Sequence, residues 1–170
     1  GTRATSARPG GGSSLTQTDI PLLFYSRQIG LADGREVPVQ GGARLTGRLG
    51  RFTMGLLNVQ ADDEPVTRTR ATNFSVLRLK RDILRKSSIG LIATGRSVTV
   101  NGSGSNAVYG VDGVFSFFDN LDFNTYWART RTTGLSGDDT SYRASLVYGG
   151  DRYGVELERL AVGDNFNPEV

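Results

Sequence analysis

Apolar and polar residues alternate strictly along much of the chain, beginning near Ala43. Leu45 and Leu49 alternate with Arg44 and Arg48, and the pattern resumes after a tight turn. A period of two over this length predicts β-strands that have one apolar and one polar face. Because the polar face carries two arginines, the hairpin is predicted to lie between an apolar medium and water.

The same alternation recurs between turn-rich segments and predicts eight strands, each near the length of a membrane-spanning strand. An apolar and aromatic segment at Ile20–Ile29 is predicted to be extended as well, which raises the count to about nine. The eight strands are predicted at Ala43–Leu49, Phe52–Ala61, Thr72–Arg81, Ser88–Gly95, Asn106–Phe118, Asp122–Thr132, Thr140–Tyr148 and Arg152–Leu160.

Short and long connections alternate between these strands. Outer-membrane barrels show this asymmetry, with tight turns at the periplasmic end and longer loops outside. The sequence therefore predicts an all-β fold, an antiparallel up-and-down β-barrel of the outer-membrane type. Long connections are expected at Asp62–Ala71, Arg96–Ser105 and Thr133–Asp139, and short ones at Gly50, Asp82–Ser87, Asp119–Leu121 and Gly149–Asp151.

The two faces of the predicted strands are expected to contact different media. A charge is costly on a face that meets lipid, so the charged face is expected to line a water-filled lumen. In the third strand, Phe74 and Val76 share the charged face, and Leu77 and Leu79 are the outward residues. The expected lipid-facing residues are Leu45, Leu49, Phe52, Met54, Leu146, Val155 and Leu157. The expected lumen-facing residues are Arg44, Arg48, Arg78, Lys80, Asp112, Arg143, Glu156 and Glu158.

Composition narrows the choice of function class. Hydrophobic residues make up 37% of the chain, and no apolar run approaches the roughly 18 residues of a spanning helix. A formal net charge of +3 from scattered basic residues gives no nucleic-acid footprint. The chain has no Cys and no His, which removes disulfides, thiolate metal sites and the commonest general base.

The chain is predicted to divide into a lead-in and a barrel section. Residues 1–19 are rich in Gly, Ser, Thr and Arg, lack the apolar core of a signal peptide, and are predicted to be flexible. Residues 20–170 are predicted to form the barrel section.

Acidic residues gather in two predicted loops, Asp62 to Glu64 and Asp138 to Asp139. Such residues can bind a loop cation or act as the carboxylate pair of a glycoside hydrolase. Neither run has the spacing of a calcium loop, and loop acids are usually solvated. We therefore predict no catalytic, cofactor-binding or metal-binding residue.

Basic residues are concentrated after the third strand begins. They can guide an anionic solute, or pair with Glu156 and Glu158 across a lumen. Mutual neutralisation of lumen charges is the favoured interpretation for most of them. The set comprises Arg78, Lys80, Arg81, Arg85 and Lys86.

Five segments carry a resemblance to a known family: Leu23–Leu31, Val37–Asp63, Ala71–Ile92, Asn106–Phe115 and Gly163–Val170. Together they resemble a bacterial family of unknown function. Its members commonly join an N-terminal carbohydrate-binding family 9-like domain to a C-terminal outer-membrane-like β-barrel. The resemblance covers most of residues 22–170 in one order and implies a barrel of more than eight strands. Because the chain stops without a terminal aromatic residue, we expect an internal fragment whose flanking segments belong to the same polypeptide.

The fold and the resemblance together predict the function. We expect a bacterial outer-membrane β-barrel protein for passage or surface binding of a solute, with carbohydrate implied by the family's partner domain. The expected partners are outer-membrane lipid and a carbohydrate or another small solute. We expect no enzymatic activity and no cofactor. Two other classes stay open: a barrel-borne glycan hydrolase, and a soluble β-sandwich module that binds carbohydrate.

Overall fold

The computed structural model describes residues 31–32, 35–36, 38–63, 70–99 and 102–170. Within them the fold is all-β: eight strands form one sheet, and two short strands, β1 (Leu31–Ala32) and β2 (Arg35–Glu36), pair with each other. No helix among the described residues is long and apolar enough to cross a membrane. The large sheet consists of β3 (Val39–Leu49), β4 (Phe52–Ala61), β5 (Thr72–Leu84), β6 (Ser87–Arg96), β7 (Asn106–Phe117), β8 (Leu121–Thr132), β9 (Thr140–Gly149) and β10 (Gly154–Val162).

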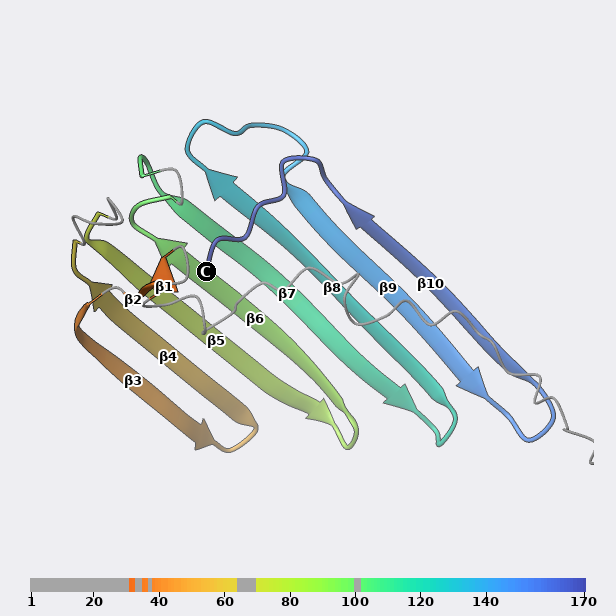
Figure 1. Ribbon diagram of the computed structural model, residues 1–170. Coiled ribbons are helices and arrows are strands. Elements are labelled where there is room, and N and C mark those ends of the chain that lie inside the picture. Colours follow the sequence, from red (N-terminus) through yellow and green to blue (C-terminus); the bar gives the residue numbers. More distant parts are fainter. Residues whose placement is uncertain (1–30, 33–34, 37, 64–69, 100–101) are drawn as a thin grey trace, which may run out of the picture.

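Each strand of the large sheet pairs antiparallel with its neighbours in the chain, in the order β3 to β10 (Figure 1). This confirms the predicted antiparallel up-and-down architecture. The sheet is not closed, because β3 and β10 each have one partner strand among the described residues. An open meander of this kind is the form that a section of a barrel wall takes. The extended segment predicted at Ile20–Ile29 and the lead-in at 1–19 lie outside the described residues.

The tight turns lie at one end of the sheet and the longer connections at the other (Figure 1). At Gly50 the backbone φ is 58°, a left-handed conformation that glycine adopts without a steric penalty. Between β5 and β6 only Arg85 and Lys86 separate the strands, because β5 continues to Leu84 instead of ending at Arg81. The predicted alternation of short and long connections is present, with this turn tighter than expected.

Successive hairpins are staggered along the sheet. Arg81 pairs with Phe52, the first residue of β4, yet β5 continues to Leu84. Val114 pairs with Ser88 near the start of β6, yet β7 continues beyond it. Staggered registers tilt the strands against the axis of curvature, as closure of a sheet into a barrel requires.

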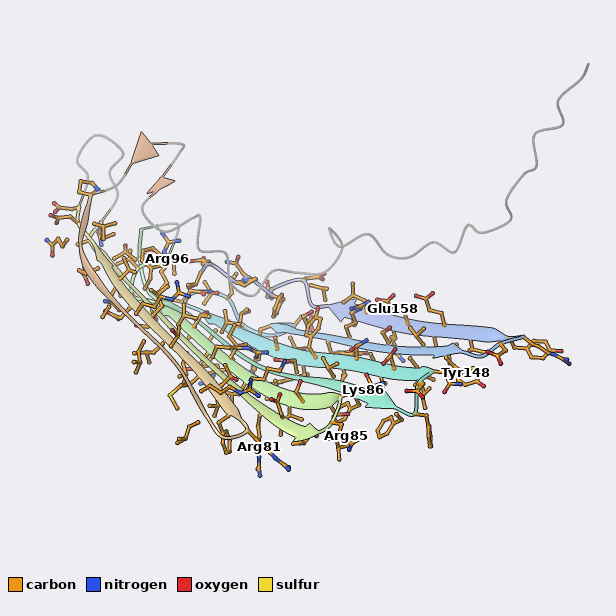
Figure 2. The ribbon with its side chains drawn as sticks, turned by 90° about the horizontal axis from the view of Figure 1, so that it is seen from below. Arg81, Arg85, Lys86, Arg96, Tyr148 and Glu158 are labelled. Carbon is orange, nitrogen blue, oxygen red and sulfur yellow. The ribbon has the colours of Figure 1, made fainter. Side chains whose placement is uncertain are left out.

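The curved sheet has two chemically different faces. Figure 2 shows Arg96 and Glu158 on its concave side and Arg81 on its convex side. Partner residues in neighbouring strands share a face, so the registers assign the strand residues to one side or the other. Leu146, opposite Leu157, lies on the convex face. The exposed large apolar residues of that face are Leu45, Leu49, Phe52, Met54, Leu56, Leu77, Leu79, Ile89, Leu91, Tyr109, Val111, Phe117, Trp127, Tyr148, Val155 and Leu157.

The apolar core lies on the concave face, near the long-connection end of β4 and β5. Val170 packs there against Phe74 and Val76, and all three are buried. Ala61 belongs to the same cluster, and Leu57 and Val59 pack beside it. The alternation indicated that Phe74 and Val76 share the charged face. Their burial beneath a distant part of the chain explains how apolar side chains are accommodated there.

Candidate functional site on the concave face

All eight residues predicted to face a lumen lie on the concave face. One row of partners contains four of them and runs from Arg48 through Thr53, Lys80, Gly90, Asp112 and Tyr126 to Arg143, and the other four lie in rows parallel to it. That the concave face lines a lumen stays a prediction. The eight residues are Arg44, Arg48, Arg78, Lys80, Asp112, Arg143, Glu156 and Glu158.

The centre of the concave face holds a bidentate ion pair between Arg78 on β5 and Asp112 on β7. Nη2 of Arg78 donates to Oδ2 of Asp112 at 2.9 Å, and Nη1 donates to Oδ1. The two residues reach each other across β6 because Gly90 lies between them. A Cβ at Gly90 would come within 2.6 Å of Nη2 of Arg78 and 2.7 Å of both carboxylate oxygens. The missing side chain therefore leaves the space that the ion pair occupies.

A second ion pair joins β9 and β10, where Nε of Arg143 donates to Oε1 of Glu158. Its side chains are only 24% and 14% exposed, so this pair is less hydrated than the one at Arg78. Tyr126 lies beside it on β8, and its hydroxyl is 3.0 Å from the hydroxyl of Ser141. A hollow of about 130 Å³ separates the two ion pairs and includes Asp112, Tyr126 and Arg143 in its lining.

The cations nearer β3 are less fully neutralised. Nη2 of Arg48 donates to Oδ2 of Asp82 at 3.2 Å, and both side chains are well exposed. Within the described part of the chain, Arg44 and Lys80 have no hydrogen-bond or ion-pair partner. The concave face is therefore cationic towards β3–β5, whereas Glu156 and Glu158 place acidic groups on β10.

A larger hollow of about 510 Å³ lies over this cationic end. It is open to one side, and its centre is formed by Gly55 and Thr53 of β4, which have no long side chain. None of the described residues that line it is acidic. The lining residues are Thr46, Gly47, Arg48, Thr53, Met54, Gly55, Arg78 and Lys80.

The segment at 163–170, called the strap here, crosses the concave face over β8, β7 and β6 (Figure 1). The backbone N–H of Asn167 donates to the Thr130 hydroxyl at 3.1 Å, and the Asn167 carbonyl accepts from Nδ2 of Asn106 at 2.8 Å. The carbonyl of Glu169 accepts from Arg96 at 3.4 Å. Each of these three strands thus contributes one polar side chain that hydrogen-bonds to the backbone of the strap.

The residues beneath the strap are among the most buried in the molecule. Asn106 and Thr130 are 1% exposed, and Arg96 lies with its guanidinium carbon 5.2 Å from the centre of the Phe74 ring. Sequence reasoning placed Asn106 and Thr130 in strands and Arg96 in the long connection after Gly95, whereas β6 continues to Arg96, and it missed the contact of all three with the strap. The one signal was the polar character of Asn106 and Thr130 beside Val108, which pairs with Thr130 on the same face.

The acidic loop residues are not brought together. Asp62 and Asp63 follow β4, whereas Asp138 and Asp139 precede β9, and β4 and β8 are four places apart in the sheet. At a strand spacing near 4.8 Å this places them roughly 19 Å apart along the sheet, beyond the separation of glycosidase carboxylates. Glu64 lies outside the described residues.

The environments of these carboxylates also differ from that of a general acid. A hydrogen bond from the side chain of Gln40, followed by bonds from Asp63, holds the pKa of Asp62 below its usual value. A general acid requires a raised pKa. Oδ2 of Asp139 accepts from Nε of Arg129 at 3.0 Å, so this carboxylate serves an ion pair. Within the described ranges, no cluster of three or more acidic side chains is placed to hold a metal ion.

The predicted basic set is divided by the fold. Arg78 and Lys80 lie on the concave face, whereas Arg81 lies on the convex face, 5.0 Å from the centre of the Phe52 ring. Arg85 and Lys86 form the turn after β5, and Lys86 donates to Asp119 of the neighbouring turn at 3.1 Å. The pairing considered for Arg78 with the acids of β10 does not occur, because Asp112 occupies its guanidinium.

Comparison with known proteins adds no relative: no protein-family model, no curated protein and no solved structure matches the chain.

Proposed function

We propose that this sheet is a wall section of a β-barrel in the bacterial outer membrane, with its convex face against lipid and its concave face against water. The observation that carries the proposal is the distribution of exposed apolar side chains. Leu45, Leu77, Val111 and Leu157 represent four different strands, yet all lie exposed on the convex face. An exposed apolar surface of this extent is a contact surface for lipid or another apolar partner.

Polar residues bound the apolar belt at the long-connection end of the convex face. Asn58 of β4 donates to Ser75 of β5 at 2.8 Å and to Asn73 at 3.0 Å, and Asn73 donates to Gln60 at 3.2 Å. A lipid-exposed network of this kind is costly in hydrocarbon but stable in a headgroup region. It marks where the strands would emerge from the bilayer.

Three of the basic residues on the convex face lie near strand ends. Arg81 lies three residues from the end of the 13-residue β5, and Arg129 and Arg131 lie within the last four residues of β8, whereas Arg159 is the sixth of the nine residues of β10. Long basic side chains near a membrane interface direct their charge into water, at a cost of about 0–1 kcal/mol there. The guanidinium carbon of Arg159 lies 5.9 Å from the centre of the Tyr142 ring.

The concave face supports a role in passage or surface binding of a solute. Its ion pairs fix polar side chains in place, and a hollow remains over β3–β5. A carbohydrate solute is the choice that the family resemblance favours. Because the acidic loop residues lie far apart and the hydrogen bond from Gln40 lowers the pKa of Asp62 instead of raising it, we propose no catalysis in this part of the chain.

Folding into lipid tests the membrane assignment directly. The chain, refolded into phospholipid vesicles, is expected to become protease-resistant and to show heat-modifiable migration on a gel. A monodisperse, folded protein in detergent-free buffer would instead indicate a soluble β-protein. Conductance across a planar bilayer then separates passage from surface binding, because only passage requires an open path.

A further inference from the structure

We infer that the hollow over β3–β5 binds an oxyanion: a carboxylate, sulfate or phosphate group, as a free ion or on a larger solute. The inference goes beyond the proposed membrane role and depends only on the concave face. Among the described residues that line the hollow, three are cations, Arg48, Arg78 and Lys80, and none is an acid.

The geometry of the three strands leaves room for such a group. Two adjacent rows of partners cross the hollow: Thr46, Gly55 and Arg78 form one, and Arg48, Thr53 and Lys80 form the other. In both rows the middle residue belongs to β4 and is small. Side chains of β3 and β5 therefore stand about 10 Å apart over a shallow floor, and an oxyanion fits between them.

The hydrogen-bond donors of the hollow are only partly used. Lys80 has no partner in the described ranges, and Arg48 gives one of its five N–H groups to Asp82. The hydroxyls of Thr46 and Thr53 stand beside these cations on the same face. Both terminal nitrogens of Arg78 already donate to Asp112, so Arg78 adds positive charge to the hollow and few free hydrogen-bond donors. Lys80 and Arg48 are the residues that would contact the anion.

The surrounding charges favour the same ligand. Arg44 lies on the same face of β3 and has no partner in the described ranges, and Arg51 and Arg85 occupy the two tight turns beside the hollow. Figure 2 shows Arg85 at the turn end of the sheet, near Lys86. Clustered positive charge beside a surface hollow raises the local concentration of anions.

Titration of the full, isotope-labelled chain in detergent micelles tests this inference. Inorganic sulfate, inorganic phosphate and glucuronate are added at low ionic strength, with glucose as the uncharged counterpart of glucuronate. Saturable amide shifts at Thr53 and Gly55 are expected with at least one anion and not with glucose. Saturation by sulfate or phosphate would show that a free ion is sufficient for binding. Saturation by glucuronate alone would show that the site requires an anionic group on a larger solute.

Three variants distinguish anion binding at a defined site from general attraction of anions to a positively charged surface. Lys80→Gln is expected to weaken binding by about tenfold, because it removes an unpaired charge. Gly55→Val is expected to abolish binding by filling the floor. A Cβ at Gly55 would be 3.9 Å from the nearest atom, Cβ of Arg78, which is an ordinary van der Waals contact. Arg85→Gln removes the same charge at the same end of the sheet, outside the lining, and is expected to change binding by less than about twofold.

Three results would overturn the inference: no saturable shift with any anion, equal response to glucose, or equal weakening by Lys80→Gln and Arg85→Gln. None of these measurements involves insertion into a bilayer. Failure of the anion site therefore leaves the vesicle-folding result unaffected, and failure to fold into vesicles leaves the binding result unaffected.

Discussion

Arg78 and Asp112 are joined by a bidentate ion pair that crosses a strand to which neither belongs. The pair bridges β5 and β7 over Gly90 of β6, so these two strands are joined by side chains in addition to the backbone ladders that each shares with β6. Such a contact needs both long-range partners and an empty position between them. The absence of a side chain at Gly90 is therefore as necessary for the ion pair as the two charged residues are.

Replacement of Gly90 by alanine is expected to destabilise the protein by about 1–3 kcal/mol, because the new methyl group displaces the guanidinium or the carboxylate. Gly95→Ala is the matched control on the same strand, since a Cβ there meets no atom within 4 Å. Urea unfolding of the refolded chain measures both changes.

The cost at Gly90 is expected to depend on its neighbours. In an Asp112→Ala background the methyl group has room, so the penalty of Gly90→Ala should fall by about 1 kcal/mol or more. An unchanged penalty in that background would show that the glycine is needed for another reason.

The two glutamates of β10 provide a second comparison. Glu158 accepts from Arg143, and both side chains are largely buried, whereas Glu156 is exposed on the same face and strand. We expect Glu158→Gln to cost about 1.5–3 kcal/mol, because a charged hydrogen bond is lost and Arg143 is left without its counter-charge. Glu156→Gln should cost less than about 0.5 kcal/mol. Equal effects in urea unfolding would contradict the role given to this ion pair.

The division of residues between faces could be predicted from the sequence because β-strands have a fixed period of two. The alternation of neighbouring residues along one strand is enough to place Leu45 and Arg44 on opposite faces. The partners of the charges could not be predicted in this way. Arg78 pairs with Asp112 because the register of three strands and the absence of a side chain at Gly90 act together. Alternation within one strand contains none of that information.

The position of the strap on the sheet could not be predicted from sequence patterns either. Asn165 and Asn167 lie in a segment without periodicity, and its place depends on where Thr130 and Asn106 come together in the folded sheet. The burial of Phe74 and Val76 on the charged face is a consequence of the strap. In the sequence of β5 alone they are exceptions to the alternation of polar and apolar residues, whereas the fold shows that Val170 of the strap covers them.

Substitution of Thr130 by valine tests how much its hydrogen bond with Asn167 stabilises the strap on the sheet. Valine keeps the shape but leaves the backbone N–H of Asn167 without its acceptor at 3.1 Å, which should cost about 1–3 kcal/mol. Hydrogen exchange is expected to increase at 165–170 and to stay unchanged in β9. Thr125→Val, on the opposite face of β8, is the control, because its hydroxyl donates to the carbonyl of Arg143 and not to the strap. Increased exchange across all strands would mean that the substitution loosens the sheet itself.

The two rims of the sheet make a topological prediction that trypsin can test on intact cells. The long connection after β4 contains Arg68 and Arg70, whereas the tight turns contain Arg51, Arg85 and Arg152. In an up-and-down membrane barrel, added trypsin should cleave at the first set and leave the second intact. Cells opened before digestion supply the control, because both rims are then accessible. Cleavage at both sets in intact cells would contradict a membrane crossing between the rims.

The assignment of the convex face to lipid makes the most direct prediction. Leu146 is the seventh of the ten residues of β9 and lies on that face, between Phe123 of β8 and Leu157 of β10. An arginine there would place its charge in hydrocarbon, and we expect Leu146→Arg to cost roughly 2–4 kcal/mol when the chain unfolds from lipid vesicles.

The next residue along the strand gives the matched control. Val147 points to the concave face and is 37% exposed, so Val147→Arg introduces the same side chain at nearly the same depth but into water. Its cost should be within about 0.5 kcal/mol of zero. The difference between the two variants therefore measures the medium on each face, independently of strand propensity or overall charge. If Leu146→Arg and Val147→Arg unfold from vesicles with equal free energies, the two faces meet the same medium, and the convex face is not the lipid-facing one.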